Sequence, residues 1–273
     1  QGGMGEVYRA KEKIGSVERE LALKLIRADR LGDPQAVDRL VNEGVLTQDI
    51  RHPNVVGVYN VGVEGTQPFV AMEFVDGASL REWIRRQMNM QKDTALPVAA
   101  AIIRSILEGL DAAHRKGVIH RDLKPENIII TGEPTGESAP LKVLDFGIAR
   151  APGTQHTTGS AMLTPEYGAP EQRTNADGVM ASADLYSLSK IFYELLMGVF
   201  PDGHWQPPSG GRGDVPEAID KLIQAGLSSR PQSRPQSVED YRARLDRAMG
   251  MPVKQKPQQP VSPVNTLFGG GTD

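Results

Sequence analysis

Two motifs, separated by the short segment TGEPTGESAPL, dominate the middle of this 273-residue chain. Residues 120–130 read HRDLKPENIII, and residues 142–150 read KVLDFGIAR. Together they supply a carboxylate (Asp122), a cation (Lys124) and two oxygen donors suited to a hard divalent metal ion (Asn127 and Asp145). A polar turn followed by a hairpin would explain neither these identities nor their order, and the chance occurrence of both strings is negligible.

The first residues of the chain hold closely spaced glycines before an expected strand. Gly2 and Gly5 would let backbone amides approach a phosphate without interference from a Cβ atom. By itself, this pattern is more often an ordinary hairpin turn.

A lysine and a glutamate downstream suggest a buried ion pair. In ELALKLI, the period of two places Lys24 on a mostly apolar strand face, where it needs an anion. Glu43 lies three residues after Leu40 and three before Leu46, on the inward stripe of an expected helix. Pairing would satisfy both charges, whereas a solvated edge lysine and a solvated helix glutamate are the alternatives.

Local patterns predict a β-rich unit followed by a helical one. Strands are expected at 1–10, 20–26, 55–63 and 68–75, with a helix beginning at Asp33 between the second and the third. Helices are expected from Pro97 to a C′ glycine at Gly117, and over residues 182–197. From residue 250 onward, prolines and glutamines indicate a linker.

Composition narrows the possible partners. The net charge of −3 gives no argument for nucleic-acid binding, and the absence of cysteine excludes disulfides and thiolate metal sites. Without a spanning apolar run or a signal peptide, the expected location is the cytoplasm, with a membrane tether through a downstream segment as the alternative. Because the chain starts at Gln1 within a glycine-rich segment, we expect the natural protein to extend upstream.

These motifs resemble those of the protein kinase family. The resemblance covers residues 1–249 and implies an α+β, two-lobed fold, with a small β-rich N-lobe (about 1–75, its first strand lying upstream) and a larger helical C-lobe (about 76–249). Residues 250–273 would be a Pro/Gln-rich linker or tail. The style of several strings, including HPNVV and TPEYGAPEQ, is similar to the eukaryotic-like Ser/Thr kinases of bacteria.

The resemblance implies an ATP site between the lobes. Lys24 would bind the α- and β-phosphates, with Glu43 as its ion-pair partner. Met72 would lie at the back of the adenine pocket, where the backbones of Glu73 and Val75 would meet the adenine edge. The remaining expected nucleotide contacts are Gly2, Gly5, Val7 and Ala22.

The same resemblance assigns the chemistry. Asp122 would accept the proton of the substrate hydroxyl, and Lys124 would stabilise the transferring charge. Asn127 and Asp145 would hold Mg²⁺, with Mn²⁺ as an alternative. Lysine two residues after the catalytic aspartate is similar to the Ser/Thr-specific form, which implies a protein substrate with serine or threonine.

Further positions follow from the family pattern. Glu171 is expected to pair with Arg234, and Asp184 to brace the catalytic loop from a central helix. Arg121 can receive a phosphate, so activation by phosphorylation is expected, with self-association for autophosphorylation as a corollary. The candidate acceptors lie after the second motif, between Ile148 and Pro165, and are Thr154, Thr157, Thr158 and Ser160.

Some positions depart from the family pattern. Leu163 and Gly168 alter the surface that receives the substrate, and Ser189 replaces a glycine of the central helix, a change expected to need a small packing adjustment. Residues 131–141 predict a long exposed turn, and the proline- and glycine-rich residues 198–218 predict that a helix is shortened or absent.

Two other classes of protein share part of this pattern. A pseudokinase would keep the fold as a binding module, but Lys24, Glu43, Asp122, Asn127 and Asp145 are all present. A small-molecule kinase would share the catalytic and metal residues. Glu171 and Arg234 favour a protein substrate instead.

Overall fold

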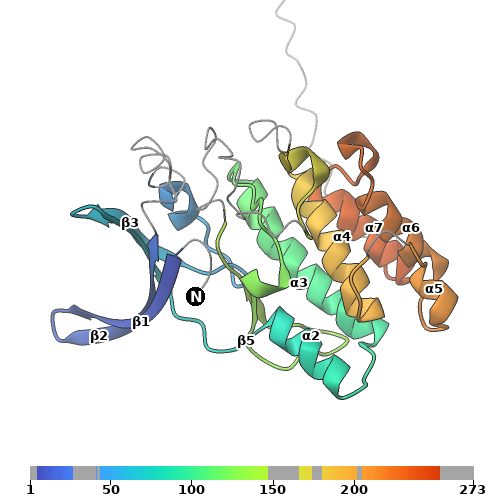
Figure 1. Ribbon diagram of the computed structural model, residues 1–273, viewed down its shortest axis with the longest axis horizontal. Helices are drawn as coiled ribbons and strands as arrows, with labels where there is room; N and C mark the ends of the chain where they lie inside the picture. Colours follow the sequence, from blue (N-terminus) through green and yellow to red (C-terminus); the bar gives the residue numbers. More distant parts are fainter. Residues whose placement is uncertain are drawn as a thin grey trace, which may run out of the picture.

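The computed structural model describes residues 5–26, 41, 44–146, 166–173, 180–201 and 205–252, which form two lobes (Figure 1). A small lobe of antiparallel strands lies at one end, and a larger, mainly helical lobe makes up the rest. The expected α+β, two-lobed class is therefore confirmed. Among these residues, no helix combines the length and apolar character that crossing a membrane requires.

Four antiparallel strands form the sheet of the small lobe, in the order β1-β2-β4-β3. They are β1 (Gly5–Ile14), β2 (Val17–Ile26), β3 (Val58–Glu64) and β4 (Gln67–Glu73). Gly15 and Gly65 turn the two hairpins with φ values of 63° and 60°, which a residue with a Cβ atom adopts only at a cost. Ile26, Val61 and Met72 help to form the core beneath the sheet.

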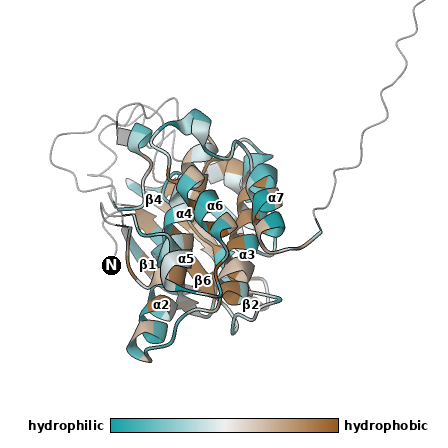
Figure 2. Ribbon diagram, turned by 90° about the vertical axis from the view of Figure 1, so that its right-hand side faces the viewer, coloured by the Kyte–Doolittle hydropathy of each residue, from teal (hydrophilic) through white to brown (hydrophobic). Residues whose placement is uncertain are grey.

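The larger lobe is built around two long helices. These are α3 (Leu96–His114) and α4 (Ser182–Met197), accompanied by α2 (Leu80–Asn89), α5 (Pro208–Gly211), α6 (Glu217–Gly226) and α7 (Val238–Ala248). The prediction of a deeply buried helix over residues 182–197 is confirmed, since apolar residues surround most of α4 and lie in the core. Figure 2 shows the strand β6 as apolar and α7 as hydrophilic on its outer side.

A second, smaller sheet carries the two polar motifs. Its strands are β5 (Ala78–Ser79), β6 (Ile128–Ile130) and β7 (Leu141–Val143), in that order. The motif at residues 120–127 enters β6, and Asp145 follows β7. Pairing of β6 with β7 therefore brings the two motifs to the same end of the hairpin.

Several local expectations can be compared with the structure. The turn between β6 and β7 is long and mostly exposed, and α5 is only one turn, as residues 198–218 predicted. Helix α3 ends with Arg115 at its C-cap, so Gly117 lies at C″, one residue beyond the predicted C′ position, with φ 74°. Of the helix expected from Asp33, residues 41 and 44–48 are described and helical.

Candidate active site

The catalytic-loop candidates contact one another directly. Lys124 Nζ lies 2.8 Å from Asp122 Oδ2. Asn127 Nδ2 donates to the backbone carbonyl of Asp122 at 2.8 Å and to its Oδ2 at 3.3 Å. A short 3-10 helix, Pro125–Asn127, turns the chain back so that these side chains converge. The spacing of the motif thus gathers a carboxylate, an ammonium group and an amide within hydrogen-bonding distance.

The loop is held from below by Asp184, in the first turn of α4. Its carboxylate accepts hydrogen bonds from the backbone N–H groups of His120 and Arg121 at 2.9 and 2.8 Å, and it contacts His114 Nε2 at 2.8 Å. Burial alone would raise the pKa of Asp184, but His114 and the neighbouring His120 outweigh burial and lower it. The expected brace is therefore present as an ionised carboxylate.

Asp145 joins the second motif to the small lobe. Lys24 Nζ lies 2.8 Å from Asp145 Oδ2, and both side chains are largely buried. Burial would raise the pKa of Asp145, but Lys24, with help from His120 and Lys124, lowers it below its ordinary value. The next residue, Phe146, is buried against His120 with ring centroids 4.8 Å apart.

Two residues beside the site adopt left-handed backbone conformations. Arg121 has φ 64° and Asp145 has φ 58°, and neither is glycine. Such conformations cost about 1–2 kcal/mol each and persist only where the surroundings fix them. Arg121 directly precedes Asp122, and Asp145 is itself one of the predicted site residues. The surrounding structure therefore imposes the backbone geometry of this region.

The expected nucleotide contacts lie mainly on β2 and β4. Ala22 is paired with Met72 and Lys24 with Val70, while Val7 of β1 is paired with Lys24. Met72 is buried, and Val75 packs against the same core.

The carboxylate of Glu73 already has partners within the protein. Its Oε2 lies 3.1 Å from Lys142 Nζ and accepts the Gly57 N–H at 3.1 Å. Gly5 begins β1, whereas Gly2 and Glu43 lie outside the described residues. The predicted Lys24–Glu43 pair therefore stays a prediction.

The two expected metal-binding residues fit a hard cation. The amide nitrogen of Asn127 is engaged by Asp122, so its carbonyl oxygen is the atom available to a ligand. With Asp145, it offers two oxygen donors, and Mg²⁺ characteristically uses one or two protein oxygens together with water and substrate phosphates. Among the described residues, no group of three or more His, Cys, Asp or Glu side chains forms a closed metal cage.

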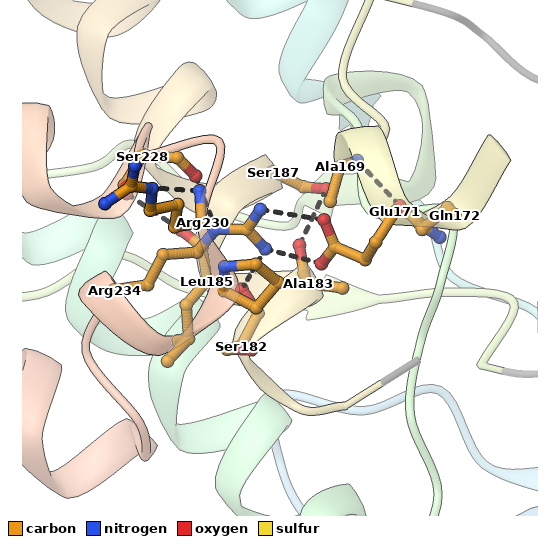
Figure 3. A network of polar contacts seen from close by, with 12 residues as sticks. Ala169, Glu171, Gln172, Ser182, Ala183, Leu185, Ser187, Ser228, Arg230 and Arg234 are labelled. Carbon is orange, nitrogen blue, oxygen red and sulfur yellow. Dashed lines mark hydrogen bonds and ion pairs between the residues drawn. The ribbon is translucent and has the colours of Figure 1, made fainter. Parts of the chain in front are cut away.

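The predicted long-range pair between Glu171 and Arg234 is present (Figure 3). Both oxygens of the Glu171 carboxylate accept from the guanidinium, at 2.6 and 2.8 Å. Burial would raise the pKa of Glu171, but the hydrogen bonds from Arg234 lower it. The pair fixes residues 170–173 against the segment that precedes α7.

Sequence reasoning missed a polar cluster that borders the catalytic loop. Arg81 of α2 donates to Glu126 at 2.8 Å and also contacts Glu194 of α4 and the hydroxyl of Tyr167. Tyr167 in turn donates to Glu194. Burial, and to a smaller extent the Glu194 carboxylate, raises the pKa of Tyr167. An arginine near the start of an amphipathic helix gives no sequence signal of such a role, because it normally faces solvent.

The side chain of Gln172 was missed as well. It is buried beside residues 120–127, and its hydrogen bonds within the described part of the chain are to backbone atoms. The candidate phosphorylation sites Thr154, Thr157, Thr158 and Ser160, and the unusual Leu163, lie outside the described residues.

Comparison with known proteins agrees with this geometry. The model of the protein kinase domain family matches residues 1–240. Serine/threonine-protein kinase Pkn1 of Myxococcus xanthus is 34% identical over 93% of this chain, and PknB of Mycobacterium leprae is 33% identical over 90%. The chain covers 38% and 41% of these two proteins, so it spans less than half of their length.

Solved structures show the same architecture. The crystal structure of the Mycobacterium tuberculosis PknI kinase domain superposes with a TM-score of 0.70 and 25% identity. The match covers 90% of this chain and 91% of that one. Together with the family model, which accounts for most of the sequence, this likeness shows that the chain belongs to the protein kinase family.

Proposed function

We propose that this chain is the catalytic domain of an ATP-dependent kinase that phosphorylates serine or threonine in proteins. The observation that carries the proposal is the cluster in which Asp122, Lys124 and Asn127 contact one another. The names of the relatives and the lysine two residues after Asp122 support the choice of serine or threonine. The ion pair between Glu171 and Arg234 favours a protein substrate over a small molecule.

The proposed reaction needs little covalent chemistry from the protein. The oxygen of a substrate hydroxyl attacks the γ-phosphorus of ATP, the bond from that phosphorus to the β–γ bridging oxygen breaks, and ADP leaves. Asp122 orients the hydroxyl and receives its proton, while Lys124, already beside that carboxylate, stabilises charge on the transferring phosphoryl group. Lys24 lies close enough to Asp145 to position the α- and β-phosphates next to it.

A divalent cation held by Asn127 and Asp145 would neutralise charge on the phosphate oxygens. The protein's own contribution is to keep both oxygen donors in place. Asn127 does so through its hydrogen bonds to Asp122, and Asp145 through its contact with Lys24. We place the domain at residues 1–249, with 250–273 as a linker, because the family match ends near the last helix.

The test compares phosphoryl transfer by the full-length protein with that of Asp122→Asn. With labelled ATP, Mg²⁺ and a generic protein acceptor, the variant should be slower by about 10²–10⁴-fold, because it loses its proton acceptor. Asp240→Asn, the same change on the outside of α7, is the matched control and should leave the rate unchanged. Mass spectrometry of the products should place phosphate on serine or threonine.

Two results would contradict the proposal. Undiminished transfer by Asp122→Asn would remove Asp122 from the reaction. A wild-type protein that binds ATP but phosphorylates neither itself nor a protein acceptor would point to a binding module or to a metabolite substrate.

A further inference from the structure

The side chain of Gln172 joins the segment around Ala169 to the catalytic loop at residues 120–127. It is 3% exposed. Its Oε1 accepts the backbone N–H of Ala169 at 2.8 Å, a contact visible in Figure 3, and its Nε2 donates to the backbone carbonyl of Arg121 at 2.7 Å. Glu171, the preceding residue, instead bonds to Arg234. Glu171 and Gln172 belong to the same short 3-10 helix, Pro170–Arg173. Their side chains secure this helix to Arg234 and to Arg121, respectively.

The carbonyl that Gln172 contacts belongs to the peptide unit between Arg121 and Asp122. A peptide unit is planar, so fixing its oxygen also fixes its N–H and the Cα atom of Asp122. The N–H of this unit points at His120 Nδ1 at 3.3 Å, and the N–H of the preceding unit donates to Asp184 at 2.8 Å. The left-handed conformation of Arg121 is therefore held from both sides, by Asp184 before it and by Gln172 after it.

We infer that Gln172 is a positioning residue that orients Asp122 through the Arg121–Asp122 peptide. The inference rests on the proposed function, in which Asp122 accepts the proton. A glutamine is suited to this role because one end of its amide accepts from Ala169 while the other donates to Arg121. Methionine, of similar length, offers neither bond, and an ionised glutamate would place an acceptor against the Arg121 carbonyl.

Gln172→Glu therefore gives a test that depends on protonation. A protonated glutamate can accept from Ala169 and donate to Arg121, whereas an ionised one cannot donate. A buried glutamate facing a carbonyl has its pKa raised above the ordinary value of about 4.3. Three charged residues lie on the contacting segments. Glu171 is paired with Arg234, Asp184 bonds to the loop N–H groups and to His114, and Arg121 supplies the carbonyl that residue 172 faces.

The experiment measures kcat, the KM for ATP and thermal stability for Gln172→Met and Gln172→Glu in the full-length protein. Gln172→Met should lower kcat by about 10- to 10²-fold with little change in KM, because a small misplacement of a catalytic group has effects of this size. Gln87→Met, at another buried glutamine in α2, is the matched control and should retain kcat. Relative to wild type at each pH, Gln172→Glu should be impaired at pH 8 and recover as the pH falls toward 6.

A purely structural role would give a different result. Both variants would then melt earlier, but kcat per folded molecule would equal that of wild type and the Gln172→Glu ratio would not change with pH. This outcome would overturn the inference. If Gln172→Met fails to fold, the pH dependence within Gln172→Glu alone still decides the question.

Hydrogen exchange of the amides at 119–123 supplies a readout that needs no activity. Faster exchange there in Gln172→Met than in Gln87→Met is expected, and equal exchange would reject the positioning contact. The wild type could also be inactive while hydrogen exchange at 119–123 is faster in Gln172→Met. That result would reject the proposed function, and with it the effect of Gln172 on catalysis, but it would support the contact between Gln172 and Arg121. Failure of the two proposals is thus distinguishable.

Discussion

The guanidinium of Arg234 shows how one buried charge can hold several segments. It is almost fully buried and donates to Glu171, to the Ser228 carbonyl at 2.8 Å and to the Ser182 carbonyl at 3.3 Å. A buried cation is tolerated because acceptors surround it. Loss of one acceptor therefore costs much more than loss of an exposed partner.

Replacing Glu171 by alanine should destabilise the fold by about 3–5 kcal/mol, because it leaves the Arg234 charge buried without its main counter-ion. The matched control is Asp240→Ala, which breaks a half-exposed pair with Arg244 within one helix and should cost about 0.5 kcal/mol. Urea unfolding gives both values. Equal losses would show that burial does not strengthen the Glu171 pair, and Glu171→Ala with Arg234→Met should recover part of the loss.

At the level of single residues, the sequence predicted contacts of motif residues with other side chains or with the loop. The family pattern predicted the contact of Glu171 with Arg234 and the brace by Asp184, and both are confirmed. The contact of Lys24 with Asp145 was not predicted, because strand periodicity identifies a buried lysine without identifying its anion. Gln172 was missed because its partners are backbone atoms, which a sequence does not distinguish from one position to the next.

Among the elements, the contact of α4 with α6 explains how the chain accommodates Ser189. The Ser189 hydroxyl donates to the Leu185 carbonyl at 2.8 Å and lies 3.1 Å from the Tyr241 hydroxyl, so it is satisfied inside the core. Gly226 of α6 faces it, and a Cβ atom at that position would lie 1.9 Å from Ser189 Oγ. The adjustment expected for Ser189 is therefore an opposing residue without a side chain.

Gly226→Ala should destabilise the protein by about 1–3 kcal/mol through overpacking, despite the better helix propensity of alanine. Adding Ser189→Gly should restore much of this loss, since it removes the Ser189 Oγ and Cβ atoms that the new Cβ would clash with. The Tyr241 hydroxyl then loses a hydrogen-bond partner. Gly211→Ala, with no atom within 4 Å of the new Cβ, is the control and should be nearly neutral. Thermal melts of Gly226→Ala, Ser189→Gly, the double variant and Gly211→Ala test the coupling, and additive effects would contradict it.

The strands of the small lobe and the two longest helices were predicted from the sequence, whereas α2, α6 and α7 were not. Apolar residues around most of its circumference gave the limits of α4, and alternation with glycine turns gave the strands of the small lobe. The end of α3 was predicted one residue late, because Gly117 shows where a positive φ is needed but not how many residues of turn precede it. The polar cluster around Arg81 joins three distant elements, and such a tertiary contact has no local signature.

Across the whole molecule, carboxylates join the lobes and secure the loops. Lys24 of β2 meets Asp145, which follows β7, and Glu73 of β4 meets Lys142 of β7. Together with Glu171 and Asp184, Asp145 has a pKa lowered by its folded surroundings. Folding therefore favours the deprotonated forms of Asp145, Glu171 and Asp184.

The stability of the fold should consequently decrease as the pH is lowered. A carboxyl group whose pKa is lower in the folded state contributes fully above its unfolded pKa of about 4, and this contribution is lost as the pH falls through the folded value. Urea midpoints should be nearly constant from pH 7 to pH 5 and then drop steeply toward pH 3. Glu171→Gln should show a shallower drop than wild type, and a midpoint that rises on acidification would refute this account.

The contacts that hold the Arg121–Asp122 peptide also determine when this peptide can be oriented during protein synthesis. Ribosomes build a chain from its N-terminus, so residues 120–127 emerge before Gln172, Asp184 and Arg234 have been synthesised. A nascent chain that has reached only the middle of the sequence carries Asp122 and Asp145 but lacks the contacts that orient the catalytic loop. Residues 120–127 are thus oriented only late in translation, after the residues of α4 have been synthesised.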